Sequence, residues 1–337
     1  MKVSYEKLKE TIKSALINNK VDEKRAEIMA KVHADSTLKG VNSHGINRVP
    51  RLVKFINEGL INLDGEIELK KAKGACEVYD GNLGFGVINA MACVERVTDL
   101  AKSHGIGMVS LRNTTHWMRG GAYGEMIADK GLIGMCWTNT ESVLPLWGSD
   151  ELSLGNNPVG IAIPSDTGNI CLDMAVSLYS YGKLETTRLK GEILPYPGGY
   201  DADGNITDDP AKIEETGRLL PIGYWKGSGL GIALDTMAAL LSNGKSTYHM
   251  DDDDNAFNCT GCSQIFIAMD PEIFSTKEEN EATIKKIKER IASAHPIEEG
   301  KKPRYPGQGL ISRKNKNLEA GIEVDDNIFK EVENLGK

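Results

Sequence analysis

Two short apolar segments in the middle of the chain restrict its fold more than any other feature. Residues 159–163 and 170–174 are each typical of a strand, and a Pro-Ser-Asp-Thr-Gly turn sequence separates them. Strands joined by so few residues pair as an antiparallel hairpin, because a parallel pair needs a crossover of a dozen residues or more. Strands and helices elsewhere do not alternate strictly. We therefore predict an α/β (α+β) fold with a mixed, mostly antiparallel sheet and flanking helices.

The N-terminal part of the chain is almost entirely helical in pattern. Apolar residues recur at helical spacing over residues 4–18, then from Asp22 to near Gly40, and in a third helix that ends at Gly59. Pro50 fits the first turn of that third helix. These helices predict a separate layer. The tail from Lys301 onward is basic and contains proline and glycine, so we interpret it as loop.

Composition and charge exclude several classes of partner. The chain of 337 residues has a formal net charge of −8 and no basic block, which argues against nucleic acid. No apolar run approaches the ~18 residues that a membrane span needs, and Met1–Lys7 lacks the apolar core of a signal peptide. We therefore predict a cytoplasmic protein without a membrane partner. Cys259 and Cys262 form a lone CxxC with no second pair at zinc spacing, so no metal is predicted.

The stretch Gly40–Arg51 concentrates groups that can do chemistry. His44 can exchange a proton near neutral pH, and Arg48 can hold a carboxylate through two hydrogen bonds. Ser43 adds a neutral donor. Glycines and a proline make this stretch a structured connection between helices, which suits a site for an anionic substrate. The alternative is that His44 only caps a helix.

A second polar loop, residues 113–121, contains His116 with Arg119 close by. Two histidines in two glycine-rich loops fit a site better than a core, whereas His33 lies on an apolar helix face and is assigned to the core or its boundary. No nucleophile elbow, P-loop or HExxH motif is present, so hydrolase and kinase activities lack their residues.

A standard dinucleotide fingerprint is also missing. Gly81-x-x-Gly84-x-Gly86 has the wrong spacing, and Gly227-Ser228-Gly229 continues to Ile232 where a third glycine would stand. The glycines beside Lys226 suit a phosphate at a helix start. They serve close helix packing equally well, so both interpretations stay open.

Several blocks together resemble the type 2 malate/lactate dehydrogenase family. The likeness runs nearly from end to end and is closest to members that act on a keto sugar acid. The blocks that carry it are Gly40-Val41-x-Ser43-His44-Gly45-x-Asn47-Arg48, His116-Trp117-Met118-Arg119-Gly120-Gly121, Cys136-Trp137-Thr138-Asn139, Leu220-Pro221-x-Gly223-Tyr224-Trp225-Lys226-Gly227-Ser228-Gly229 and Ser263-Gln264-Ile265-Phe266-Ile267-Ala268.

The resemblance implies a nicotinamide-dependent 2-keto acid reductase whose cofactor domain is not a Rossmann fold. A helical domain of residues 1–75 with 281–337, formed by both chain ends, would adjoin a cofactor and substrate domain of residues 76–280. His44 would be the proton donor, with Arg48, His116 and Ser43 in the substrate pocket.

The resemblance also implies NAD, as NADH, for the cofactor, with NADP possible, and a homodimer. The residues expected to contact the cofactor are Asn169, Ile170, Cys171, Leu172, Asp173, Met174, Ala175, Trp225, Lys226, Gly307, Gln308 and Gly309. Gln308 departs from the usual form of its turn, which has a charged or imidazole side chain there. Arg188 and Lys190 do not decide between NAD and NADP.

Two other functions stay open. One keeps the family and changes the substrate to malate, lactate, sulfolactate, ureidoglycolate or an imino acid. The other is a non-catalytic sugar-acid binding protein that has kept the pocket, which the retained His44 and His116 disfavour.

Overall fold

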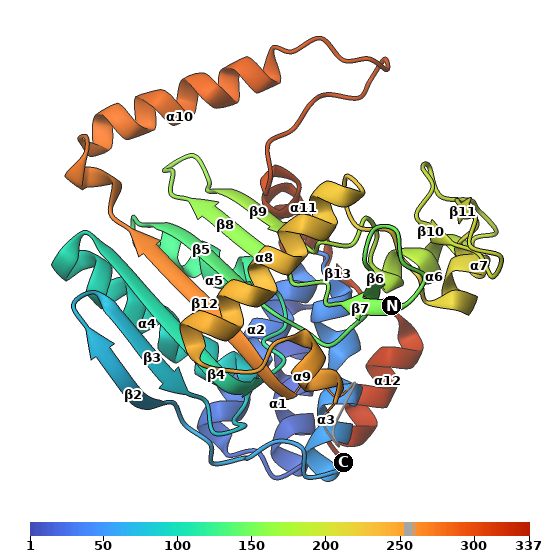
Figure 1. Ribbon diagram of the computed structural model, residues 1–337, viewed down its shortest axis with the longest axis horizontal. Helices are drawn as coiled ribbons and strands as arrows, with labels where there is room; N and C mark the ends of the chain where they lie inside the picture. The colour runs from blue at the N-terminus through green and yellow to red at the C-terminus, as the bar shows by residue number, and fades with distance from the viewer. Residues whose placement is uncertain (253–257, 259) are drawn as a thin grey trace.

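The computed structural model describes residues 1–252, 258 and 260–337 and is built around a seven-stranded sheet (Figure 1). In spatial order its strands are β2 (Glu68–Lys73), β3 (Cys76–Asp80), β4 (Ile106–Thr115), β12 (Thr260–Met269), β5 (Ile133–Thr138), β8 (Val159–Ile163) and β9 (Ile170–Met174). Only β3 and β4 pair in parallel; the other five pairs are antiparallel. The predicted mixed, mostly antiparallel sheet is confirmed, and so is the β8–β9 hairpin.

Helices cover both faces of this sheet. Helices α4 (Gly86–His104) and α5 (Gly120–Ala128) pack on one face, and α8 (Trp225–Ser242) packs on the other. Neighbouring residues of β12 illustrate the division: Phe266 belongs to the core under α4 and α5, and Ile265 to the core under α8. Successive side chains of a strand point to opposite faces, so residues 265–269 of β12, which helices cover on both sides, are all apolar.

A helical layer made from both chain ends adjoins the sheet. It contains β1 (Lys2–Val3), α1 (Tyr5–Asn18), α2 (Glu23–Leu38), α3 (Val49–Asn57), β13 (Ile322–Glu323) and α12 (Asp326–Leu335). The side chain of Ser4 caps α1 by accepting from the N–H of Lys7, and Asp22 caps α2 in the same way through Arg25. The predicted contribution of both chain ends is confirmed.

The loop prediction for the C-terminal tail is wrong. Helix α11 (Gln308–Ala320) follows the Pro-Gly turn, and α12 packs Phe329 and Val332 into the apolar core that it shares with α1. Helix α10 (Lys277–Ala292) lies apart from both, where Lys288 donates to the carbonyl of Gly168 over 2.7 Å in the β8–β9 turn. The division at residues 75 and 281 therefore stays a prediction.

Short elements complete the described part of the chain. They are η1 (Asn42–His44), η2 (Ile46–Arg48), β6 (Leu144–Pro145), β7 (Leu152–Leu154), α6 (Tyr181–Leu189), β10 (Gly199–Tyr200), β11 (Ile206–Thr207), α7 (Pro210–Thr216), α9 (Thr247–Asp251) and η3 (Pro271–Ile273). None of the helices in residues 1–252, 258 and 260–337 combines the length and apolar content that a membrane crossing requires.

Candidate active site

His44 lies in a connection that α2 holds from behind. The connection consists of the turns η1 and η2, and α3 then begins at Val49 with Pro50 in its first turn, as predicted. Buried His33 on α2 contacts the carbonyl of Gly45 through Nδ1 at 3.0 Å, and Thr37 Oγ1 accepts from the N–H of Ile46 at 2.9 Å. Because the carbonyl can only accept, Nδ1 of His33 carries the proton. The assignment of His33 to the core is confirmed.

Gly45 leaves no space for a side chain, which gives a stability prediction. A Cβ there would lie 2.9 Å from the nitrogen of Thr37 and 3.1 Å from the carbonyl oxygen of His33. We expect Gly45→Ala to lower the free energy of unfolding by about 1–3 kcal/mol, as overpacked sites do. Thermal denaturation measures this against Gly229→Ala, in the second turn of α8, where a Cβ meets nothing within 4 Å. Equal melting temperatures for Gly45→Ala and the wild-type protein would contradict the prediction.

His116 follows β4 in a tight, well-defined turn. The N–H of Met118 donates to Nδ1 of His116 over 2.9 Å. Met118 has a φ of 69°. The side chains of Met118 and Trp117 are both buried, so the turn is anchored in the core. An Nδ1 that accepts carries no proton, so a neutral His116 carries its proton on Nε2 and presents that N–H as a donor.

The structure brings the predicted substrate residues together. The rings of His44 and His116 stack with centroids 5.8 Å apart and an interplanar angle of 23°. Ser43 Oγ lies 3.1 Å from Nδ1 of His44. Arg48 lies at the start of α3, and its positive charge disfavours the protonated form of both imidazoles.

Both imidazoles are neutral at pH 7 in this arrangement. Burial, followed by the cations of Arg48 and Arg119, lowers the pKa of His44 from 6.5 to about 4. Burial and the same Arg48 cation hold the pKa of His116 well below its usual range. An anion bound at Arg48 would offset that cation, so it would raise both pKa values.

Three segments predicted to contact a cofactor meet along β9. The N–H of Cys171 donates to the carbonyl of Pro306 over 3.0 Å, which joins β9 to the turn before α11. The N–H of Ile222 donates to the carbonyl of Val176 over 2.8 Å, which brings the start of α8, with Trp225 and Lys226, beside the end of β9.

The chemistry of these segments fits an anionic dinucleotide. Two helices start there, α8 and α11, and helix N-termini offer N–H donors to phosphates. Lys226 adds a cation, and Gly307 has a φ of 90° with the backbone nitrogen of Cys171 only 3.0 Å from a would-be Cβ. The glycine keeps this cradle open.

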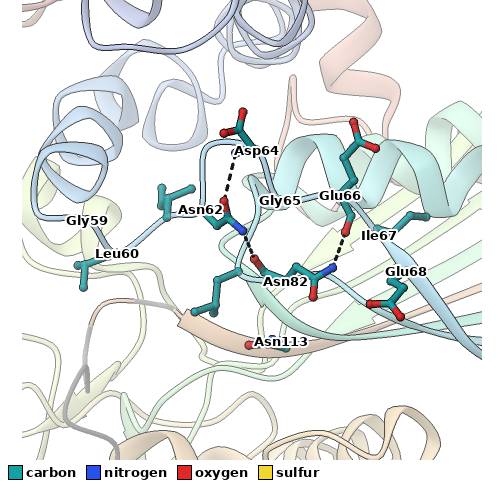
Figure 2. A pocket seen from close by; sticks show the side chains of 12 residues that line it. Gly59, Leu60, Asn62, Asp64, Gly65, Glu66, Ile67, Glu68, Asn82 and Asn113 are labelled. Carbon is teal, nitrogen blue, oxygen red and sulfur yellow. Dashed lines mark hydrogen bonds between the residues drawn. The ribbon is translucent and has the colours of Figure 1, made fainter.

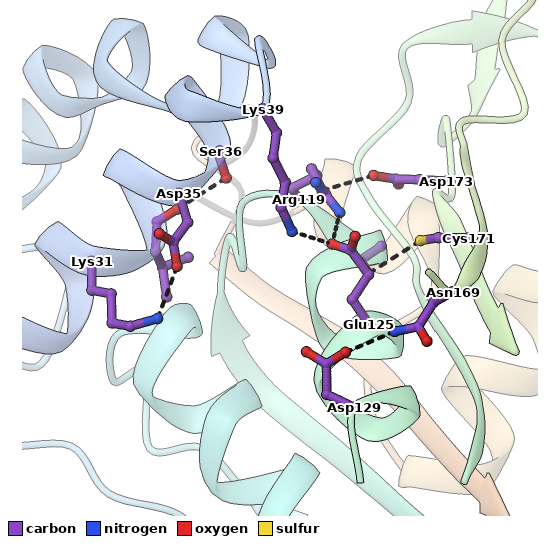
Figure 3. Close-up of polar contacts among 12 residues, drawn as sticks. Lys31, Asp35, Ser36, Lys39, Arg119, Glu125, Asp129, Asn169, Cys171 and Asp173 are labelled. Carbon is purple, nitrogen blue, oxygen red and sulfur yellow. Dashed lines mark hydrogen bonds and ion pairs between the residues drawn. The ribbon is translucent and has the colours of Figure 1, made fainter. Parts of the chain in front are cut away.

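A network of charges lies behind β9, with Arg119 buried and its partners half-buried, and the sequence pattern did not reveal it. Arg119 forms ion pairs with Asp173 (Nε to Oδ2 3.1 Å) and with Glu125, and Glu125 also accepts from Lys39 over 2.9 Å (Figure 3). Burial raises the pKa of Asp173, and the Arg119 cation and the N–H of Gly121 oppose this. Lys39 and Glu125 are far apart in sequence, so no local spacing relates them.

Two hollows differ in their relation to these groups. One of about 260 Å³ has a lining of mixed charge and borders β9 through Arg119 (Figure 3). Its charged lining residues are Lys31, Asp35, Lys39, Arg119, Glu125, Asp129 and Lys314. The larger, about 710 Å³, lies under residues 59–68 with an acidic rim that includes Asp64 and Glu66 (Figure 2). His44 and His116 line neither hollow, and the acidic rim of the larger one disfavours keto acids and dinucleotides. We therefore assign it no part in the site.

Metal ligation has no support in the described part of the chain. Residues 1–252, 258 and 260–337 contain no group of three or more His, Cys, Asp or Glu arranged to hold an ion. Cys262 is buried, whereas Cys259, the other half of the CxxC, lies outside the described residues.

His44, from the connection between α2 and α3, and His116, just after β4, lie together beside Arg48. This arrangement fits an oxidoreductase of 2-hydroxy and 2-keto acids, the class that the similar proteins below share. The profile described as malate/L-lactate dehydrogenase matches residues 3–333. The chain belongs to the malate/L-lactate dehydrogenase family, and it is an enzyme of that oxidoreductase class.

Individual relatives cover the whole chain. A 2,3-diketo-L-gulonate reductase from Escherichia coli strain UMN026 is 41% identical over 99% of this chain and 100% of its own length. The structure is similar to malate dehydrogenase from Entamoeba histolytica (TM-score 0.93, 26% identity, 99% of this chain and 97% of that one). It is also similar to sulfolactate dehydrogenase from Methanocaldococcus jannaschii (TM-score 0.88, 33% identity, 100% and 98%).

Proposed function

We propose that this protein reduces 2,3-diketo-L-gulonate to 3-dehydro-L-gulonate with NADH. The observation that carries the proposal is the stacked pair of His44 and His116 beside the cation of Arg48, in a chain 41% identical over its whole length to a 2,3-diketo-L-gulonate reductase. A 2-keto acid offers this site a carboxylate for the arginine and a ketone for the histidines.

Arg48 and His116 orient the substrate. The guanidinium of Arg48 binds the C1 carboxylate, and bidentate pairing of this kind fixes an angle as well as a distance. The Nε2–H of His116 then donates to the C2 ketone oxygen, since its Nδ1 is engaged by Met118. Ser43 supplies a further hydroxyl beside His44.

His44 supplies the proton. The nicotinamide, when bound, would supply hydride to C2 of the substrate. As negative charge develops on the ketone oxygen, protonated His44 donates to it, an effect worth roughly 10²–10⁴ in rate. The carboxylate on Arg48 offsets the cation that lowers the pKa of His44, so substrate binding favours proton uptake by this imidazole.

The cofactor is proposed to lie along β9. The residues that would hold it are Asn169–Ala175, Trp225, Lys226 and the turn Gly307-Gln308-Gly309. The contacts of β9 with Pro306 and of the segment before α8 with Val176 support this. NADH is preferred in the proposal, and NADPH is the alternative cofactor.

We propose a cytoplasmic homodimer. Helix α8 supports the dimer, because it leaves large apolar side chains exposed on the outer face of the molecule. Trp225 is 61%, Ile232 49% and Leu240 76% exposed, which is more apolar surface than scattered single residues produce.

Another 2-keto acid is the second candidate. The sulfolactate dehydrogenase and malate dehydrogenase relatives have the same fold at 33% and 26% identity. Their similarity favours a substrate with the same carboxylate and ketone but a different far end, which Arg48 and the two histidines do not contact in this proposal.

The test is an initial-rate comparison with purified protein. NADH and NADPH are each combined with 2,3-diketo-L-gulonate, oxaloacetate, sulfopyruvate and pyruvate. We expect the highest kcat/KM with NADH and 2,3-diketo-L-gulonate. If another keto acid gives a higher kcat/KM, that acid becomes the proposed substrate. If NADH binds but none of the keto acids is reduced, the result supports a binding protein instead.

A further inference from the structure

Arg119 connects the His116 turn to two other parts of the site. Its side chain is 3% exposed and pairs with Asp173 of β9 at 3.1 Å and with Glu125 of α5. Glu125 also pairs at 2.9 Å with Lys39, the residue directly after α2. Two cations and two carboxylates thus join β9, α5 and the end of α2 (Figure 3).

The ends of this network lie a short distance along the chain from the reacting groups. Arg119 comes three residues after His116, and buried Met118, with a φ of 69°, leaves the backbone between them little freedom. Lys39 comes five residues before His44, through the turn that His33 and Thr37 hold.

The fit at Asp173 is also close. The N–H of Gly121, two residues after Arg119, bonds to the carboxylate of Asp173. A Cβ on Gly121 would come within 2.6 Å of Asp173 Oδ2. The start of α5 therefore meets β9 through both a side chain and the backbone.

We propose that Arg119 is a positioning residue, which through Asp173 and Glu125 sets the distance between β9 and the His116 turn. The inference rests on the proposed function, because β9 is the segment assigned to the cofactor and His116 the residue assigned to the ketone. Hydride transfer is sensitive to this distance, since a misplacement of about 1 Å can lower a rate ~10²-fold.

The shape of the arginine side chain matters as much as its charge. Its Nη2 donates to Glu125, and its Nε lies 3.1 Å from Asp173 Oδ2 as an ion pair without the angle of a hydrogen bond, so one planar group contacts carboxylates on two elements. Lysine would keep the charge but presents a single ammonium point. If only the charge mattered, lysine at position 119 would restore the full kcat, whereas a positioning role predicts that it restores only part of kcat.

The experiment compares Arg119→Met and Arg119→Lys with the wild-type protein and with Arg96→Met. Arg96 is the control, because it also pairs with a buried carboxylate, that of Glu77 over 2.6 Å, but joins α4 to β3 away from the site. Its side chain is 42% exposed against 3% for Arg119, so the melting temperatures of both variants are measured alongside. One readout is kcat and KM for the keto acid, and the other is the Kd of NADH from fluorescence quenching without keto acid.

We expect Arg119→Met to lower kcat ~10²-fold and to raise the Kd of NADH ~tenfold, with the KM of the keto acid within about threefold. Arg119→Lys should recover part of kcat and stay about tenfold below the wild-type value. Arg96→Met should keep kcat and the Kd of NADH within about threefold of the wild-type values, even if its melting temperature is lower.

Two results would overturn the positioning role. One is an Arg119→Met variant with the kcat and the Kd of NADH of the wild-type protein. The other is an Arg96→Met variant whose kcat and NADH affinity fall as far as those of Arg119→Met, when both variants show the same drop in melting temperature. A wild-type protein that binds NADH but reduces no keto acid overturns the proposed function instead. The Kd of NADH in the Arg119 variants then still decides the role of Arg119.

Discussion

Replacing His44 with glutamine is expected to lower kcat for keto-acid reduction by roughly 10²–10⁴, the usual contribution of a general acid. Glutamine keeps polar atoms in the half-buried position beside His116 but cannot release a proton to the developing alkoxide. The KM of the keto acid should change little, because Arg48 still binds its carboxylate. Steady-state kinetics with NADH at pH 7 measures both parameters.

The control for this variant is His104→Gln. His104 is exposed at the C-terminal end of α4, so its loss removes a histidine without changing the site. Its kcat should equal that of the wild-type protein. If His44→Gln keeps kcat within tenfold, His44 is not the proton donor, and the same measurement on His116→Gln then tests the remaining histidine.

Elements with strong local signals could be predicted from the sequence. The strand bounds 159–163 and 170–174 agree with β8 and β9, because an apolar run ends at a turn sequence on each side. The first two helices begin where Ser4 and Asp22 can cap them. In each case the residues that determine the element lie within a few positions of one another.

The loop prediction for the C-terminal tail missed a helix that distant contacts stabilise. The tail contains Pro303, Pro306 and several glycines, which are typical of loops, yet α12 forms because Phe329 and Val332 bury themselves against the N-terminal helices. Most helical stability in proteins comes from such packing rather than from propensity. The segment also carries local signals that the loop prediction missed, namely the Asp325 cap and apolar residues at helical spacing from Ile328 to Leu335.

In the candidate site, too, the residues with a local signal could be predicted, but the contacts between them could not. His44 and His116 stood out because each lies in a polar, glycine-rich loop, but only the fold places their rings 5.8 Å apart. The ion pairs of Arg119 with Asp173 and Glu125 had no local signal, because each charged residue on its own resembles a solvated surface group. Conversely, the low pKa of His44 follows from burial, which a sequence does not state.

That low pKa predicts an asymmetric pH dependence of the two reaction directions. Ketone reduction by NADH consumes one proton, so the ratio of kcat/KM for reduction to kcat/KM for oxidation must fall tenfold per pH unit. With a pKa of about 4, His44 is neutral from pH 5 upward, and the protonated form that reduction needs becomes tenfold rarer with each unit. The neutral form that oxidation needs stays fully populated.

We therefore expect kcat/KM for reduction to fall about tenfold per unit from pH 5 to 8, while kcat/KM for oxidation stays flat. A His44 whose pKa lay above 8 would give the reverse, a flat reduction and an oxidation that rises with pH. The kcat for reduction should begin to fall at a higher pH than kcat/KM does, because the carboxylate bound at Arg48 raises the pKa of His44 in the complex.

Arg48→Gln supplies the control for this pH dependence. Without the cation the pKa of His44 rises toward 6.5, so the fall in kcat/KM should begin at a higher pH, although the absolute value of kcat/KM drops. Profiles of kcat/KM that coincide for Arg48→Gln and the wild-type protein would contradict the influence of Arg48 on the proton donor.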